Sequence, residues 1–329
     1  SYFCSDLHVI FITFYSCLYL YSYFMDYSLS KIYYPIQEFV MKLFQYLFIR
    51  FFHGVLKILP FNFVRFLSYP IGFIYFIFTF RTSAKLYKRK KEIFEPKKLR
   101  YDPLLVKINY SRYWLETLWL TNNNFDKYIS KNIEVINHDN VKKLKKQYPG
   151  LIFALPHMGN WEFAIPAGNN INLDLLAVAE PLSNKYVLNW FKKLRESLGI
   201  EIIIGGKGQN TFNTLEEKLI SGKDICLLSD RSVNKSGIAV EFFSNIASFP
   251  RGPVALSLKT GVPIVPTAMI KKSSGYMLYF HNPFYVPLFE NEATSIQQGL
   301  KTLSNSFEEL LSMDINDWHS IQPIWTAEY

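Results

Sequence analysis

The segment LIFALPHMGNWE, from Leu151 to Glu162, holds the side chains of this chain best suited to proton transfer. An apolar run ends at Pro156, His157 follows, and Glu162 comes five residues after the histidine. Five steps of about 100° on one helix would put the two side chains roughly 140° apart, off a common face. We therefore expect His157 on a strand-to-helix turn and Glu162 in the first helical turn, where the two can meet.

This pairing has a clear chemical use. A carboxylate on one imidazole nitrogen fixes the tautomer, raises the basicity of the ring and leaves the other nitrogen to accept a proton. The segment has no Ser or Cys nucleophile, so the pattern favours a His157 that deprotonates a substrate hydroxyl. An isolated HxxxxE spacing more often marks a histidine that only satisfies a turn. A metal site would need a second His or Cys at ligand spacing, and the segment has none.

The elements that would position this turn are typical of an α/β protein. From about residue 102, short apolar runs alternate with helical stretches, which predicts a mainly parallel, buried central sheet flanked by helices. The predicted strands are Leu151–Leu155, Leu175–Ala179, Ile202–Ile204, Ile225–Leu228, Pro263–Ala268 and Tyr276–Phe280. A Ser-Gly step at 274–275 predicts a hairpin between the last two. Ligands bind at the carboxyl ends of strands in such sheets.

Residue types also predict where several helices begin and end. Apolar spacing predicts an amphipathic helix over Leu104–Leu120. A helix over Arg251–Thr260 should stop at Gly261. Thr294 and Gln297 have the spacing of a capping box at the start of a C-terminal helix.

The positive charge of the chain is confined to one stretch. The 329 residues carry a net charge of +9, and 49% of them are hydrophobic. Residues 42–101 net +11, residues 1–41 net −2 and residues 102–329 net zero. The composition excludes a disordered or collagen-like chain, and three cysteines are too few for a disulfide scaffold.

The basic stretch fits a solvated face, a nucleic-acid patch or a membrane anchor. Phe66–Phe80 holds 15 uncharged residues between Arg65 and Arg81, too few to span a bilayer but enough for an interfacial segment. Leu43–Leu59 mixes bulky apolar and basic residues, as an amphipathic helix does. Basic residues beside aromatic ones favour an anionic lipid surface. We therefore expect residues 42–101 to dock on a membrane, and we expect no nucleic-acid partner.

The first residues form a separate apolar segment. Leu7–Met25 has 19 residues without Lys, Arg or carboxylate, which is long enough for a transmembrane helix. It lacks the basic start and the cleavage site of a signal peptide. The predicted organisation is a membrane segment and linker (1–41), basic docking helices (42–101) and an α/β catalytic domain (102–329). The positive-inside rule then places the basic stretch on the cytoplasmic side.

The segment HMGNWE resembles the HxxxxD/E motif of the lipid A biosynthesis acyltransferases, which include actinobacterial phosphatidylinositol mannoside acyltransferases. Six further blocks resemble the family in the same order along the chain. They are YSRYWLETLWL (110–120), LAVAEPL (176–182), RESLGIEII (195–203), CLLSDRSVNKSGIAVEFF (226–243), FPRGPVALSLKTGVPIVP (249–266) and DWHSIQPIW (317–325). The blocks RYWLE, VAE, RESLG and SDR look closest to the phosphatidylinositol mannoside branch, although that branch more often has Asp at the position of Glu162.

The resemblance implies a glycerolipid-acyltransferase-like fold and acyl transfer from acyl-CoA or acyl-ACP to a sugar hydroxyl of a glycolipid. The reaction would take place at the cytoplasmic face of the inner membrane. His157 would be the general base, and Glu162 would orient it and stabilise the imidazolium. The resemblance implies anionic membrane lipids as partners, with no metal and no tightly bound cofactor, and we expect a monomer.

Other site residues are assigned from their places after predicted strands and in the family blocks. The candidates for oxyanion stabilisation are the backbone N–H groups of Gly159, Asn160 and Trp161. The candidates for substrate contact are Glu180 and Asp230 for sugar hydroxyls, Arg195 and Arg231 for phosphate, and Phe242 and Phe243 for the acyl chain.

Other functions stay open from sequence. A lipid A precursor is the alternative acceptor, because the lipid A enzymes often have Glu at the position of Glu162. A glycerophospholipid acyltransferase would normally have Asp at that position and an FPEGTR-like block, where this chain has FPRGP. A non-catalytic membrane scaffold is the alternative from a different class. The acylated hydroxyl, the chain length and the donor carrier are not fixed by the sequence.

Overall fold

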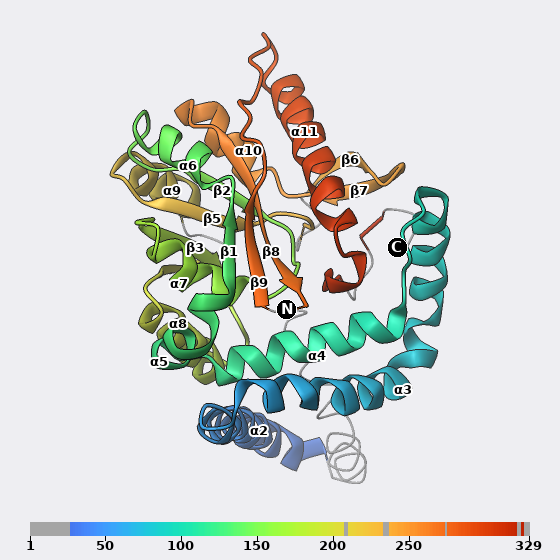
Figure 1. Ribbon diagram of the computed structural model, residues 1–329. Coiled ribbons are helices and arrows are strands. Elements are labelled where there is room, and N and C mark those ends of the chain that lie inside the picture. The colour runs from blue at the N-terminus through green and yellow to red at the C-terminus, as the bar shows by residue number, and fades with distance from the viewer. Residues whose placement is uncertain (1–26, 207–209, 233–236, 274, 321–323, 326–329) are drawn as a thin grey trace.

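A computed structural model describes residues 27–206, 210–232, 237–273, 275–320 and 324–325 of the chain (Figure 1). The transmembrane segment predicted at Leu7–Met25 lies outside these residues. The described part is built around one mixed sheet with helices on its faces and an N-terminal layer of long helices.

The central sheet has seven strands in the order β1-β9-β8-β2-β5-β3-β4. Its strands are β1 (Ile133–Ile136), β2 (Ile152–Leu155), β3 (Leu175–Ala179), β4 (Glu201–Ile204), β5 (Asp224–Leu228), β8 (Ile264–Lys272) and β9 (Gly275–Phe280). All neighbouring pairs are parallel except β8 and β9, which form the predicted hairpin. The α/β fold with a mainly parallel sheet is therefore confirmed. The sequence patterns missed β1 and a separate antiparallel pair, β6 (Ile238–Phe242) and β7 (Asn245–Phe249).

Shorter helices cover the sheet. They are α6 (His138–Lys145), α7 (Ala164–Asn169), α8 (Lys185–Ser197), α9 (Thr211–Ile220), α10 (Gly252–Thr260) and α11 (Glu292–Ser312). Helix α10 ends as predicted at Gly261, whose φ of 71° is the left-handed conformation that glycine tolerates. The capping box predicted at Thr294 is wrong, because α11 begins earlier. Asn291 caps it, accepting a hydrogen bond from the backbone of Ala293, and Gln297 donates to the carbonyl of Ala239.

The N-terminal layer consists of α2 (Tyr27–Leu56), α3 (Phe61–Phe94) and α4 (Pro103–Trp119). Figure 1 shows α4 and α3 running side by side, with α2 beyond them. Helix α4 matches the prediction, and the Asp102 carboxylate caps it by accepting from Leu104 N. The helices α3 and α4 touch through backbone at Gly72, where a Cβ atom would lie 2.5 Å from the Cα of Ile108.

The long helices share the core of the sheet. Leu56, Phe61 and Phe94 belong to the same buried apolar cluster as the strands. The indole of Trp119 also donates to the carbonyl of Leu59 at 2.9 Å. The border predicted between residues 41 and 42 falls inside α2. Residues 42–101 are thus packed into the same body as the sheet.

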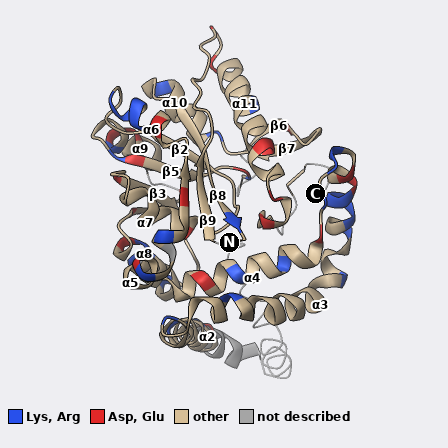
Figure 2. Ribbon diagram, in the orientation of Figure 1, with Lys and Arg blue, Asp and Glu red and all other residues tan. Residues whose placement is uncertain are grey.

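The outer faces of α2 and α3 are apolar. Large exposed side chains on them include Ile36, Phe39, Phe44, Leu47, Phe51, Phe66, Phe73, Ile77 and Phe78. The segments Ile36–Leu56 and Phe61–Lys97 are long and apolar enough to cross a membrane. Figure 2 shows basic residues gathered along the last part of α3. Lys90 in that part is buried and bonded to Ser320, and Arg89 donates to Asn245, so some of the basic charge anchors α3 to the rest of the protein.

Candidate active site

Two neighbouring strands end side by side and bring His157 close to Asp230. Strands β2 and β5 pair in parallel with Leu155 opposite Leu228, so the turns that follow them lie at the same sheet edge. The Nδ1 atom of His157 lies 2.5 Å from Oδ1 of Asp230, and the His157 backbone N–H donates to Oδ2 at 3.1 Å. One carboxylate therefore holds both the ring and the backbone of the histidine.

Asp230 is buried and ionised. Its exposed fraction is 0%, and the indole of Trp318 donates to Oδ2 at 2.7 Å. Burial alone would raise the pKa of Asp230, but the His157 charge and hydrogen bond, the Trp318 bond and the nearby Arg231 together lower it to about 2. An ionised carboxylate only accepts hydrogen bonds, so Nδ1 of His157 carries a hydrogen. In the neutral ring the lone pair is then on Nε2, the nitrogen that can take a proton from a substrate.

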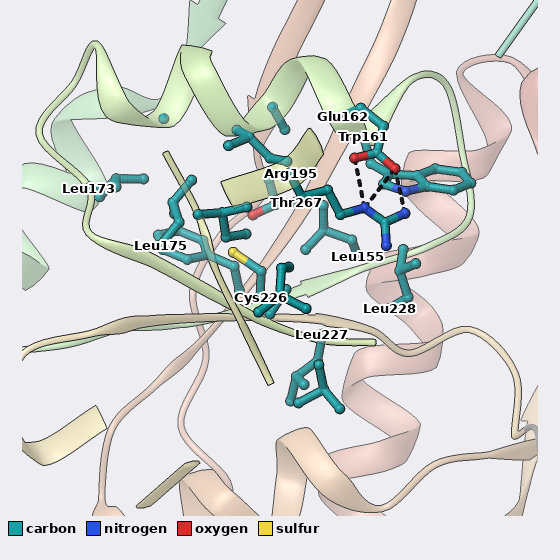
Figure 3. A pocket seen from close by; sticks show the side chains of 18 of the residues that line it. Leu155, Trp161, Glu162, Leu173, Leu175, Arg195, Cys226, Leu227, Leu228 and Thr267 are labelled. Carbon is teal, nitrogen blue, oxygen red and sulfur yellow. Dashed lines mark hydrogen bonds and ion pairs between the residues drawn. The ribbon is translucent and has the colours of Figure 1, made fainter. Parts of the chain in front are cut away.

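Glu162 does not contact His157, and the prediction that it orients the base is wrong. Its carboxylate accepts from Arg195 at 2.6, 3.0 and 3.1 Å (Figure 3). It also accepts from the Tyr113 hydroxyl at 3.2 Å. The physical reason is burial: Glu162 is 1% exposed, and a buried carboxylate needs a full positive charge close by. The guanidinium of Arg195 on α8 supplies it. Arg195 also lines the polar cavity, so its predicted contact with a phosphate stays a prediction.

The tight turn after His157 explains why Glu162 points away from the histidine. Gly159 has a φ of 61°, and a Cβ atom there would lie 1.6 Å from the carbonyl oxygen of Met269. Only glycine fits such a close approach, and it turns the chain into the short helix Trp161–Phe163. Asn160 caps that helix by accepting from Glu162 N at 3.2 Å, as its residue type predicts.

The candidate oxyanion donors have other contacts. The N–H of Gly159 donates to the carbonyl of Asp317 at 3.0 Å, so the prediction that it stabilises an oxyanion is wrong. The amide side chain of Asn160 donates to Glu116 at 3.1 Å. The indole of Trp161 packs edge-on against the His157 ring, with centroids 5.5 Å apart. For Asn160 and Trp161, the proposed use of the backbone N–H remains a prediction.

Two adjacent cavities lie beside the base. The first, called the polar cavity here, has a volume of about 290 Å³ and is lined by His157, Glu180, Arg231 and aromatic residues of α4 and α8. The second, the apolar cavity, of about 110 Å³, runs between the sheet and α7 past Leu173 and Leu175 (Figure 3). Six residues line both cavities, so the two share a border: Trp161, Val178, Ala179, Arg195, Leu227 and Leu228.

The remaining predicted residues divide between the cavity and the core. Glu180 is exposed and lines the polar cavity together with Arg231, so both keep their predicted substrate roles as predictions. Asp230 cannot bind a sugar hydroxyl directly, because it is fully buried behind His157. Phe242 and Phe243 are 0% and 1% exposed and line neither cavity. They pack against Phe94, Trp318 and Trp325 in the core, and so their predicted role in the acyl groove is wrong.

Sequence reasoning gave His319 no role, although it lies beside the base. Its backbone N–H donates to the carbonyl of His157 at 2.7 Å, and its Nε2 lies 2.8 Å from the carbonyl oxygen of Gly159. Burial lowers the pKa of His319 to about 3, so the ring is neutral at physiological pH. The DWH block from 317 was the available signal, but it suggested only packing.

No cluster of three or more His, Cys, Asp or Glu residues that could hold a metal ion is found in the part of the chain that the structure describes. The charged groups of the site are instead arranged in two pairs, His157 with Asp230 and Arg195 with Glu162. An imidazole that lines a polar cavity next to an apolar one suits chemistry on a molecule with both a hydroxyl and an aliphatic tail.

Comparison with known proteins agrees with this geometry. Residues 39–327 match the family model described as bacterial lipid A biosynthesis acyltransferase. The phosphatidylinositol mannoside acyltransferase of Mycolicibacterium smegmatis is 28% identical over 222 residues, which cover 67% of this chain and 71% of that protein. The phosphatidylinositol mannoside acyltransferase of Mycobacterium tuberculosis is 28% identical over 231 residues, covering 69% and 72%.

Proposed function

This chain belongs to the bacterial lipid A biosynthesis acyltransferase family, and on that basis we propose that it transfers a fatty acyl group from an acyl thioester to a sugar hydroxyl of a glycolipid. The observation that carries the proposal is the pairing of His157, which lines the polar cavity, with the buried carboxylate of Asp230. The glycolipid we favour is a phosphatidylinositol mannoside, because the two mycobacterial relatives are phosphatidylinositol mannoside acyltransferases.

His157 is the general base in this proposal. Its Nε2 takes the proton of the acceptor hydroxyl while the hydroxyl oxygen attacks the thioester carbonyl. Asp230 stabilises the imidazolium that forms, because its carboxylate is ionised and 2.5 Å from Nδ1. The imidazolium then gives its proton to the departing thiolate of coenzyme A or acyl carrier protein. General-base action of this kind accelerates a reaction by roughly 10²–10⁴-fold.

The apolar cavity is the proposed site of the acyl chain. Its lining is mostly aliphatic and aromatic, and the ionisable pair Glu162 and Arg195 lies at one end of it (Figure 3). It runs from that end toward Leu173 and Leu175 (Figure 3), and so a chain lying in it would leave its carbonyl near His157. The polar cavity would hold the sugar, with Glu180 accepting from hydroxyls and Arg231 facing a phosphate.

Residues of α2 and α3 are the proposed membrane-docking surface. Their exposed apolar side chains lie beside exposed basic residues such as Lys85, Lys88 and Lys91, a combination that favours an anionic lipid surface. Because α3 packs lengthwise on α4, we propose that it lies along one leaflet of the inner membrane, at the cytoplasmic face. The polar cavity is lined by α4 and α8, both of which contact α2, so a lipid acceptor would reach it from the same side.

The test uses purified protein with radiolabelled acyl-CoA and acyl-ACP, each offered with a phosphatidylinositol mannoside, with a lipid A precursor and with a glycerophospholipid acceptor. We expect acyl transfer to the mannoside, detected as a labelled glycolipid. Transfer only to the lipid A precursor, or only to a glycerophospholipid acceptor, would reject the mannoside assignment. Vesicle flotation of Phe66→Ser/Phe73→Ser/Phe78→Ser against wild type tests the docking surface, and equal binding of both to anionic vesicles would contradict it.

A further inference from the structure

Acyl transfer needs a hydrogen-bond donor for the carbonyl oxygen, which becomes negatively charged during the reaction. The backbone N–H groups closest to the base are already used within the protein. Enzymes stabilise such an oxyanion with preorganised hydrogen-bond donors. The N–H groups of His157, Met158 and Gly159 already donate to Asp230, Pro156 and Asp317, at 3.1, 2.8 and 3.0 Å. Of the predicted backbone donors, only the N–H groups of Asn160 and Trp161 are left, so a side-chain donor in the cavity would add to them or replace them.

Arg195 offers such a donor at the junction of the two cavities. Its three hydrogen bonds to Glu162 use Nε and Nη2, so neither of the two N–H bonds of Nη1 is among them. Figure 3 shows the third guanidinium nitrogen on the side of Arg195 away from Glu162, near Leu228. Arg195 lines both the apolar cavity and the cavity of His157. Nη1 thus belongs to a residue at the border between the proposed acyl-chain cavity and the cavity that His157 lines.

We propose that Arg195 Nη1 donates a hydrogen bond to the carbonyl oxygen of the acyl thioester and stabilises the oxyanion, with Glu162 as the positioning residue that fixes the guanidinium. The proposal rests on the function proposed above, since the reacting carbonyl lies at the junction only if the chain occupies the apolar cavity. It also gives Glu162 a role in catalysis that needs no contact with His157.

The step is a conventional addition and elimination. The acceptor oxygen forms a bond to the carbonyl carbon, its proton moves to Nε2 of His157, and the carbonyl π electrons become the oxyanion held by Arg195. When the C=O bond re-forms, the C–S bond breaks and the thiolate leaves with the electron pair. The thiolate takes the proton from His157, so the enzyme returns to its starting state. Arg195 gains and loses no proton.

The chemistry of the pair suits this task. Burial disfavours a charged guanidinium, but the facing carboxylate outweighs burial and raises the pKa of Arg195 above its ordinary value, so the group stays charged. Its planar fork binds Glu162 with one edge and leaves the other nitrogen in a fixed direction. A lysine at position 195 would supply the charge without this division of donors. A donor fixed before the reaction costs no reorganisation when charge develops.

The experiment compares an acyl-CoA with its dithioester analogue, in which the carbonyl oxygen is replaced by sulfur, a weaker hydrogen-bond acceptor. Transfer to a phosphatidylinositol mannoside and thiol release in its absence are both measured. We expect Arg195→Lys to lower kcat for the oxygen donor about 10²–10³-fold, the usual effect of losing an oxyanion donor. The loss with the dithioester should be much smaller, so that the preference for oxygen falls at least about tenfold.

Controls separate this role from a structural one. Arg231→Lys changes another arginine of the same cavity and should leave the oxygen-to-sulfur preference unchanged. Glu162→Gln/Arg195→Gln leaves no unpaired buried charge and should also lose the preference, which keeps the test valid if Arg195→Lys folds poorly. An unchanged preference in folded Arg195 variants would overturn the inference alone. Wild-type protein that neither transfers acyl groups to any glycolipid nor releases thiol would reject the proposed function and, with it, this inference.

Discussion

Two buried carboxylates flank the same cavity, and their partners differ. Asp230 faces the imidazole of His157 at 2.5 Å, and Glu162 faces the guanidinium of Arg195 at 2.6 Å. An imidazole exchanges its proton near neutral pH, whereas a guanidinium keeps its charge under all physiological conditions. Both carboxylates are buried, but the His157–Asp230 pair can transfer a proton, whereas the Arg195–Glu162 pair keeps a hydrogen-bond donor in a fixed position. The difference in chemistry comes from the basic side chain of each pair rather than from the carboxylate.

The largest expected effect is on the proton-moving pair itself. His157→Ala removes the proposed base, and the rate of acyl transfer should fall by roughly 10²–10⁴-fold. The rate is measured with labelled donor at saturating acceptor. Vesicle binding should stay close to that of wild type. The unfolding temperature is measured alongside, because His157→Ala removes the imidazole that faces the buried Asp230 carboxylate. Turnover close to wild type would reject His157 as the base.

Asp230→Asn should have the next largest effect. An asparagine amide can donate to Nδ1, which would put the hydrogen of the ring on Nε2 and remove the acceptor for the substrate proton. We expect kcat to fall by up to about 10⁴-fold, as when the aspartate of a Ser-His-Asp triad is replaced by asparagine, with little change in acceptor KM. Asp174→Asn, at a surface carboxylate paired with Lys223, is the matched control and should be silent. Equal effects of the two substitutions would remove Asp230 from the mechanism.

Glu162→Gln tests the fixed pair, and its main expected effect is on stability. Removing one partner leaves the charge of Arg195 buried without compensation, which costs about 3–5 kcal/mol. The free energy of unfolding is measured by urea titration, and Glu162→Gln/Arg195→Gln should recover part of the loss. A variant Glu162→Gln that is as stable as wild type but as inactive as His157→Ala would show that Glu162 serves His157 after all.

His319→Gln should change how stability depends on pH. Burial holds the folded pKa of His319 at about 3, below the ordinary value of 6.5, so the unfolded chain binds a proton that the native state does not. This difference destabilises the wild-type protein as pH falls from 6.5 toward 3, by up to about 1.4 kcal/mol per pH unit. In the variant, urea unfolding between pH 6.5 and 4 should depend less on pH. Identical pH slopes would contradict a neutral buried His319.

The smallest effect is expected outside both pairs. Glu180 is exposed at the polar cavity, and Glu180→Gln should raise the acceptor KM by roughly two- to tenfold, the range of one ordinary hydrogen bond. Its kcat should change little, because Glu180 touches neither His157 nor Arg195 in the described structure. A loss of kcat as large as that of Asp230→Asn would mean that Glu180 takes part in catalysis together with the two pairs.

Features that depend only on neighbouring residues were predicted well. The strand at Leu175–Ala179 has the predicted bounds, and the strand predicted from Leu151 begins one residue later, at Ile152. Such strands can be predicted because a short apolar run between helices is typical of a buried strand. The turn at Gly159 and the cap at Asn160 follow from residue type in the same way. The start of α11 was missed, because Asn291 and Thr294 are both good caps and only packing selects between them.

The α/β fold, the histidine at a strand end and the family blocks could all be read from the amino-acid sequence. They depend on local apolar periodicity and on ordered motifs, which need no knowledge of distant contacts. The carboxylate that serves His157 could not be read in this way, because Asp230 lies 73 residues away and reaches the base through the pairing of β2 with β5. The bond between Glu162 and Arg195 was equally out of reach. A buried carboxylate needs a positive charge close by, and spacing in the sequence does not show which positive charge folding brings near it.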